Sequence, residues 1–113
     1  MKRILASIKP FKFEELREAL VESGIEGLTV SEAKGYSEKS KGGVELYRGT
    51  EYVVDYLPRV IVEVIVPDES LDTAIGSIVA ACRTGKAGDG YIFVSHVEEA
   101  VRVRTLERGN LAL

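Results

Sequence analysis

Residues Arg59–Val66 read RVIVEVIV, and this run decides the fold of the chain. Valine and isoleucine fill six of its eight positions, and β-branched side chains favour extended strands over helices. Pro67 follows at once and ends the strand. Since apolar residues point to both faces, we expect helices to cover one face of the sheet and a second copy of the chain to cover the other.

The residues before this strand predict three further elements. Lys2–Lys9 (KRILASIK) alternates between apolar and polar residues as a strand does, and Pro10 closes it. From Phe13 the apolar residues recur at helical spacing, and Gly24 is the expected C-terminal cap. Leu28–Gly35 (LTVSEAKG) alternates again and predicts a second strand.

The residues after Pro67 repeat this order. Apolar residues at helical spacing predict a helix over 71–82, and Tyr91–Ser95 (YIFVS) predicts a strand. Val97–Arg104 (VEEAVRVR) is expected to add another strand, which would place Arg102 and Arg104 on the same face. The whole order is the βαββαβ pattern of ferredoxin-like α+β domains, with a four-stranded antiparallel sheet.

Length, composition and charge narrow the classes of protein. With 113 residues, 45% hydrophobic and 29% charged, the chain is expected to form one globular domain over residues 1–113. A net charge of −3 argues against nucleic acid as a partner. One cysteine and one histidine predict neither a disulfide framework nor a metal site. We expect a cytoplasmic protein that is not inserted into a membrane, because no apolar run is long enough to span one.

A long polar segment, Gly35–Pro58, separates the second and third strands of the sheet. Connections of about 20 residues are uncommon in compact domains and are usually functional or disordered. Its second half carries Tyr47, Arg48, Tyr52 and Tyr56, which a plain linker does not need. We therefore interpret it as an interaction segment.

A second loop, Thr84–Gly90 (TGKAGDG), holds three glycines and Lys86 at the end of the second helix. Glycines allow successive backbone N–H groups to converge on an anion, and Lys86 adds a charge that suits phosphate. Arg102 and Arg104 carry planar forks that also suit phosphate oxygens. Read singly, the loop is equally compatible with a plain helix-to-strand turn, and the arginine pair with a solvated edge strand.

The remaining reactive residues favour structural roles. Cys82 lies on the apolar stripe of the second helix, which indicates a core position rather than a nucleophile. A small enzyme acting on nucleotides would have to use His96 or Asp89, and neither has an activating partner nearby in sequence. No catalytic residues are predicted.

Four separated motifs, IKPFK, ELYRGTEYVVDYLPR, CRTGKAGDG and VRVRTLERG, together resemble the PII signal-transduction proteins over essentially the whole chain, as a divergent member. The resemblance implies a homotrimer that binds ATP or ADP in clefts between subunits. It also implies a T-loop at about residues 36–57, a B-loop at about 83–90 and a C-terminal loop at about 105–113. Through the T-loop such proteins control a target enzyme or membrane transporter.

The resemblance also assigns roles to individual residues. Tyr47 and Arg48 would contact the partner, Tyr52 matches a uridylylated tyrosine, and Thr50 matches a phosphorylated serine. Lys9, Arg59 and Ser40 would lie near 2-oxoglutarate, the second effector. The implied nucleotide contacts are Thr29, Gly35, Tyr36, Ser37, Glu63, Ile65, Thr84, Lys86, Ala87, Gly88, Asp89, Gly90, Tyr91, Arg102 and Arg104.

Several positions depart from the family pattern. The T-loop glutamine that helps to bind magnesium and 2-oxoglutarate has no counterpart, and Ser37 replaces a neighbouring glycine. Tyr91 and Arg59 stand where the family has lysines. The loss of the glutamine's metal-chelating amide is expected to weaken the binding of Mg-ATP with 2-oxoglutarate more than it weakens the binding of ADP. These departures leave open a partner outside nitrogen metabolism, such as an anion transporter.

Overall fold

The computed structural model describes residues 1–36, 42–47, 50–54 and 56–113, and between 42 and 54 it describes the backbone only. The roles assigned to Ser37, Ser40 and Arg48 therefore fall outside the described residues, and those assigned to side chains from Tyr47 to Tyr52 remain predictions.

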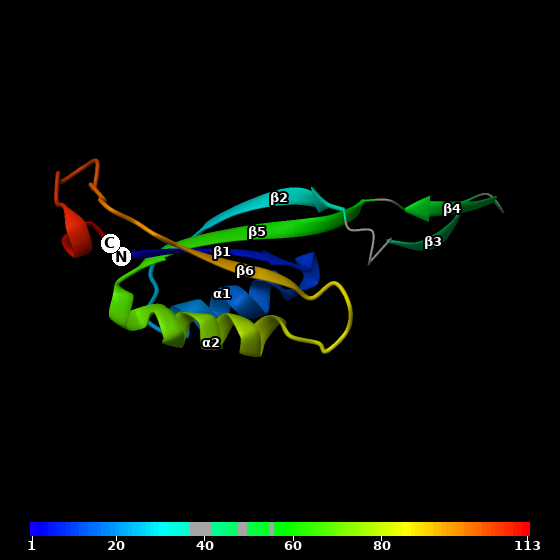
Figure 1. Ribbon diagram of the computed structural model, residues 1–113, viewed down its shortest axis with the longest axis horizontal. Coiled ribbons are helices and arrows are strands. Elements are labelled where there is room, and N and C mark those ends of the chain that lie inside the picture. The colour runs from blue at the N-terminus through cyan, green and yellow to red at the C-terminus, as the bar shows by residue number, and fades with distance from the viewer. Residues whose placement is uncertain (37–41, 48–49, 55) are drawn as a thin grey trace.

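Four strands form one antiparallel sheet: β1 (Lys2–Ile8), β2 (Thr29–Gly35), β5 (Leu57–Val66) and β6 (Gly90–His96). Their order is β2-β5-β1-β6 (Figure 1). All seven residues of β1 pair on both sides, with β5 and with β6. This topology confirms the predicted ferredoxin-like α+β fold.

Two helices, α1 (Phe13–Glu22) and α2 (Leu71–Cys82), cover one face of this sheet (Figure 1). Alternate residues of β1 and β5 point into the layer between helices and sheet, as the period of two requires. The chain leaves α1 through Gly24, whose φ of +87° suits glycine, and the N–H groups of Gly24 and Ile25 bond back to Val21 and Leu20. The buried core consists of Ile4, Ala6, Ile8, Leu16, Leu20, Val60, Val62, Val64, Val66, Ala74, Ile78 and Cys82.

The opposite face of the sheet carries apolar side chains that no described segment of the chain covers. Tyr91 and Phe93 on β6 are 68% and 59% exposed, with ring centroids 6.0 Å apart. Leu5 on β1 and Ile61 on β5 lie on the same face, between these two rings and strand β2, and both are partly exposed. The outer face of the central strands therefore carries apolar side chains beside charged ones such as Arg3 and Glu63, and the chain itself buries only the other face.

The long segment after β2 contains more regular structure than the sequence predicts. Strands β3 (Gly42–Tyr47) and β4 (Thr50–Val54) pair antiparallel in a hairpin that extends past the end of the main sheet (Figure 1). The aromatic and β-branched residues of VELY and TEYVV suit such a ladder. Because polar, glycine-rich residues precede these strands, the sequence of the whole segment indicates a loop and not a hairpin.

The prediction of a strand over Val97–Arg104 is wrong. Only Val101 makes a bridge, to Arg108, and residues 103–105 form a turn. The chain here folds back on itself, since the Arg102 and Leu106 N–H groups donate to Glu107 and Arg102 carbonyls. Its backbone hydrogen bonds therefore form within the segment and not with β2 or β6, the two edge strands of the sheet. Arg102 and Arg104 therefore do not share the face of a strand.

Replacing Leu20 by alanine tests the core. Leu20 is fully buried under the sheet, so Leu20→Ala should lower the free energy of unfolding by about 2–5 kcal/mol. Val21, the next residue of α1, is 56% exposed, and Val21→Ala should stay within about 0.5 kcal/mol. Urea denaturation measures both, and equal losses would show that the helix packs on the sheet through another face.

Candidate functional site

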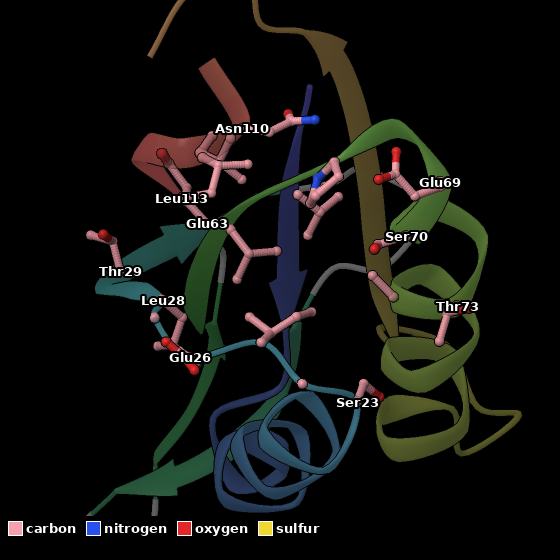
Figure 2. Close-up of a pocket in the computed structure, with 18 residues that line it drawn as sticks. Ser23, Glu26, Leu28, Thr29, Glu63, Glu69, Ser70, Thr73, Asn110 and Leu113 are labelled. Atoms are coloured by element: carbon pink, nitrogen blue, oxygen red, sulfur yellow. The ribbon is translucent and has the colours of Figure 1, made fainter. Parts of the chain in front are cut away.

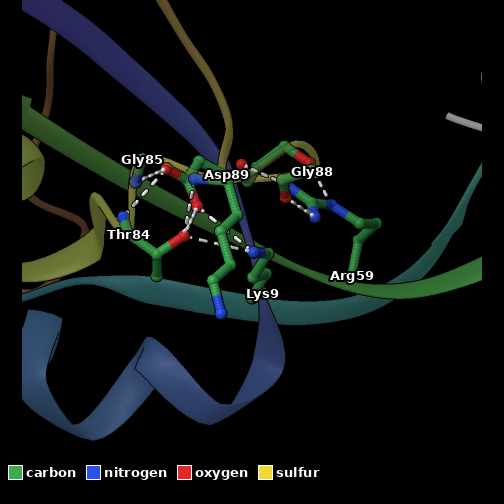
Figure 3. A network of polar contacts seen from close by, with 8 residues as sticks. Lys9, Arg59, Thr84, Gly85, Gly88 and Asp89 are labelled. Atoms are coloured by element: carbon green, nitrogen blue, oxygen red, sulfur yellow. Dashed lines mark hydrogen bonds and ion pairs between the residues drawn. The ribbon is translucent and has the colours of Figure 1, made fainter. Parts of the chain in front are cut away.

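The loop between α2 and β6 is organised around the carboxylate of Asp89. This carboxylate accepts hydrogen bonds from the N–H groups of Thr84 at 2.8 Å and Gly85 at 2.9 Å, and from the Thr84 hydroxyl (Figure 3). The Lys9 ammonium lies 3.2 Å from the same carboxylate. Residues at both ends of the loop and the end of β1 are thus held together by one side chain.

These contacts keep Asp89 ionised. The hydrogen bond from the Thr84 hydroxyl, followed by those from the Thr84 and Gly85 N–H groups, holds the pKa of Asp89 well below its usual value. The carboxylate therefore uses two of the backbone donors that an external anion would need, and the Thr84 hydroxyl accepts a third, from the Lys86 N–H.

The donors that remain lie in the second half of the loop. Among the described residues, the N–H groups of Ala87 and Gly88 have no protein acceptor, the Asp89 N–H closes the turn at residues 87–88, and no ion pair engages the Lys86 ammonium. Gly85, Gly88 and Gly90 have φ values of +82°, +89° and +112°, which turn the chain sharply on either side of these donors. Successive free N–H groups beside a cation are the requirements of an anion nest.

Arg59 joins this loop to the sheet. Its Nη1 donates to the Gly88 carbonyl at 2.6 Å and its Nη2 donates to the Ser7 carbonyl at 2.9 Å. Its Nε lies 3.3 Å from the Ser7 hydroxyl. Burial lowers the pKa of Arg59, and the Asp89 charge opposes this shift. Two residues assigned to the second effector, Lys9 and Arg59, thus make contacts within the chain.

A pocket of about 690 Å³, here the loop-end pocket, opens beside these residues. It brings together a large part of the predicted nucleotide set, from the base of the T-loop and from the B-loop. It is lined by Leu5, Ser7, Gly35, Tyr36, Leu57, Arg59, Ile61, Lys86, Ala87, Gly88, Asp89, Gly90, Tyr91 and Phe93.

Three more of the predicted nucleotide residues line a second pocket of about 870 Å³, here the C-terminal pocket (Figure 2), whereas Thr84, Arg102 and Arg104 line neither of the two. Thr29, Glu63 and Ile65 lie in it with Asn110 and Leu113 from the end of the chain. Arg3 holds the Glu63 carboxylate with two nitrogens, at 2.8 Å from Nη2 and 3.3 Å from Nε. Sequence reasoning missed Arg3, because a charged residue in a strand carries no signal of its partner.

The two pockets lie at opposite ends of the sheet. Gly90 pairs with Ile8 and His96 pairs with Lys2, so β6 runs from the loop-end pocket toward the other end. Seven strand residues span about 20 Å. The segment that follows β6, with Arg102 and Arg104, lies at the end opposite the B-loop (Figure 1). One copy of the chain therefore does not bring the whole predicted nucleotide set together.

Cys82 occupies the core position that the sequence predicts. Cys82 is buried in the core, and burial raises the pKa of its thiol to about 11, which keeps it protonated. The part of the chain that the structure describes contains no group of three or more His, Cys, Asp or Glu residues that would suit a metal ion. In the same residues, no helix is both long and apolar enough for a membrane span.

The fold and the site define a ferredoxin-like α+β domain with a glycine-rich, partly unsatisfied loop between its second helix and its last strand. A family model described as Nitrogen regulatory protein P-II matches residues 1–107. The chain belongs to this family of regulatory signal-transduction proteins.

Relatives named as nitrogen regulatory proteins match over the full chain. The chain is 57% identical to Nitrogen regulatory protein P-II of Rhodobacter capsulatus over 113 residues, all of both chains. It is 57% identical to that of Rhizobium meliloti over 109 residues, 96% of each chain. It is 51% identical to Nitrogen regulatory protein P-II 1 of Escherichia coli over 113 residues, again all of both chains.

Gly90→Ala tests the close packing at the end of the loop. A Cβ at Gly90 would lie 1.7 Å from the Ser7 carbonyl oxygen and 2.4 Å from Arg59 Nη2, at a φ that alanine rarely adopts. Overpacking and backbone strain each cost about 1–3 kcal/mol, so we expect a loss of at least about 2 kcal/mol in unfolding free energy. Gly76→Ala, in open space on α2, should instead stabilise by about 0.5–1 kcal/mol. A neutral Gly90→Ala would contradict this packing.

Asp89→Asn tests the electrostatic closure of the loop. The pKa of Asp89 is lower in the folded than in the unfolded chain, so its ionised form stabilises the fold at any pH above the unfolded value of about 4. That contribution is lost as the pH falls toward the folded pKa. The variant should therefore be less stable than wild type at pH 7, and the difference should shrink below pH about 4. Urea denaturation across pH measures it, with the exposed Glu18→Gln as control; a difference that stays constant with pH would contradict the assignment.

Proposed function

We propose that this protein is an adenine-nucleotide-sensing regulator in the cytoplasm. As a homotrimer, it would bind ATP or ADP between its subunits. Through its T-loop it would control a target enzyme or membrane transporter of nitrogen and carbon metabolism. The names of its relatives support the regulatory role in nitrogen metabolism.

The observation that carries the nucleotide proposal is the set of free donors in the B-loop. Asp89, Lys9 and Arg59 satisfy one another or the nearby backbone, whereas the N–H groups of Ala87 and Gly88 and the Lys86 ammonium have no protein partner among the described residues. A phosphate offers several acceptor oxygens and negative charge to such a set. A diphosphate or triphosphate would complete contacts that the chain leaves open.

The separation of the two pockets supports a site shared between copies. Arg102 and Arg104 follow β6, whose seven residues span about 20 Å starting from the B-loop, and Thr29 and Glu63 line the C-terminal pocket. Two copies that pack with opposite ends adjacent would bring the two halves together. The uncovered apolar face, with Phe93 and Tyr91, offers the surface on which copies would pack.

Regulation would follow from the position of the loop-end pocket at the base of the T-loop. Gly35 and Leu57, which flank the T-loop, line the same pocket as Lys86. A ligand that contacts this base differently in two loop conformations shifts their populations. We propose the hairpin β3–β4, with Tyr47 and Arg48, as the partner surface, and Tyr52 and Thr50 as candidate modification sites.

Calorimetry with two variants tests nucleotide binding. Lys86→Met removes the free cation of the B-loop, and Arg104→Ala removes the proposed contact from the neighbouring copy. A hydrogen bond to a charged group contributes about 1.5–3 kcal/mol, so each variant should bind ADP about tenfold more weakly or worse. Arg17→Met, on the exposed side of α1, should bind ADP like the wild type.

Mixed oligomers provide the decisive control. When the Lys86→Met and Arg104→Ala chains are co-expressed, some sites combine an intact B-loop from one copy with an intact Arg104 from another. Those sites should recover wild-type affinity for ADP. The absence of any recovery would contradict a shared site, and a wild type that binds neither ADP nor ATP would refute the nucleotide proposal. Titration of Mg-ATP with and without 2-oxoglutarate determines whether the second effector matters.

A further inference from the structure

Arg59 lies between two glycines that make room for it. A Cβ at Gly35, at the base of the T-loop, would lie 2.8 Å from Arg59 Cγ and 3.3 Å from its Cδ. A Cβ at Gly90, at the end of the B-loop, would lie 2.4 Å from Arg59 Nη2. One side chain therefore contacts the bases of both loops, its aliphatic stem against one and its guanidinium against the other.

All three nitrogens of the Arg59 guanidinium donate hydrogen bonds to other residues of the chain. Gly88 and Ser7 accept from Nη1 and Nη2, and the Ser7 hydroxyl lies within reach of Nε. The bonds to Ser7 anchor the fork on β1, the central strand of the sheet. The bond to Gly88 then fixes the plane of the Gly88–Asp89 peptide, because a trans peptide is rigid. It thereby directs the Asp89 N–H away from the fork, toward the turn at residues 87–88 that presents the free Ala87 and Gly88 N–H groups.

We propose that Arg59 is a positioning residue that couples the base of the T-loop at Gly35 to the donor geometry of the B-loop at Gly88. A shift of the T-loop base displaces the aliphatic part of the Arg59 side chain and, with it, the guanidinium. The guanidinium then reorients the Gly88–Asp89 peptide in the part of the B-loop where the anion would bind. The coupling runs equally in the reverse direction, as linkage requires. The nucleotide part of the test rests on the proposed function, but the coupling itself does not.

Arg59→Lys separates this role from direct contact with an effector. Lysine keeps the positive charge but cannot hold two carbonyls in a planar fork. If Arg59 positions the loop, the variant should bind ADP about tenfold more weakly with no second effector present. If Arg59 acts only as a charge that touches a ligand, ADP affinity should stay within about twofold. Arg17→Lys, the same exchange at an exposed ion pair on α1, is the matched control.

A measurement without nucleotide tests the coupling directly. In the ligand-free protein, NMR relaxation order parameters of the Gly88 and Asp89 amides should fall in Arg59→Lys from about 0.85 toward about 0.6, while Val62 in the core stays unchanged. Gly35→Ala should lower the same order parameters from the T-loop side. In the double variant the Gly35→Ala effect should disappear, because the side chain that transmits it is gone.

Each outcome bears on the proposal. Additive effects of Gly35→Ala and Arg59→Lys, or unchanged order parameters in both, would overturn the coupling. If the wild type binds no nucleotide, the function proposed above fails while the order-parameter cycle still decides the coupling. Should Arg59→Lys fail to fold, Ser7→Ala removes only the hydroxyl beside Nε and should loosen the Gly88 amide in the same direction. A Gly88 amide as rigid in Ser7→Ala as in wild type would then overturn the anchoring on β1.

Discussion

The pairing of β1 with β5 on one side and β6 on the other is the constraint on which the rest of the structure depends. Seven consecutive residues pair on both sides, so a shift by one residue would turn Ile4, Ala6 and Ile8 out of the core. The same register determines what lies at each end of the sheet. Gly90 lies beside Ile8, which brings the B-loop to Ser7 and Lys9, whereas the turn after His96 lies at the Lys2 end.

Most charged side chains in and beside the B-loop form ion pairs or hydrogen bonds within the chain, although the sequence alone suggests that they are free to bind a ligand. Asp89 takes the first backbone donors, and Lys9 and Arg59 are drawn to Asp89 and to backbone carbonyls. The loop thus holds its own shape before any ligand arrives, which reduces the ordering that binding would require. Lys86 and the free N–H groups of Ala87 and Gly88 remain available at the loop-end pocket.

Helices and strands could be predicted where one face is buried, because burial of alternate or third and fourth residues leaves a period in the sequence. That holds for Arg59–Val66 and for 71–82, whose observed elements are Leu57–Val66 and Leu71–Cys82. It fails for Val97–Arg104, where the alternation exists but the segment bonds back onto itself instead of joining the sheet. The site was predictable in part, because the glycines of Thr84–Gly90 indicate a sharply turned loop. No local pattern in the sequence indicates that Ser7 accepts from Arg59 or that Arg3 pairs with Glu63.

The sequence by itself determined the order of the four sheet strands and the two helices, the faces of these elements that are buried, the resemblance to the P-II family and the position of the long loop and the glycine-rich loop. These depend on side-chain type and local spacing. Only the tertiary structure decided which charges are engaged, which donors stay free and which residues share a pocket. Arg59 contacts Gly88 and Ser7, 29 and 52 residues away, because strand register brings them together, and no local pattern encodes a distance between segments.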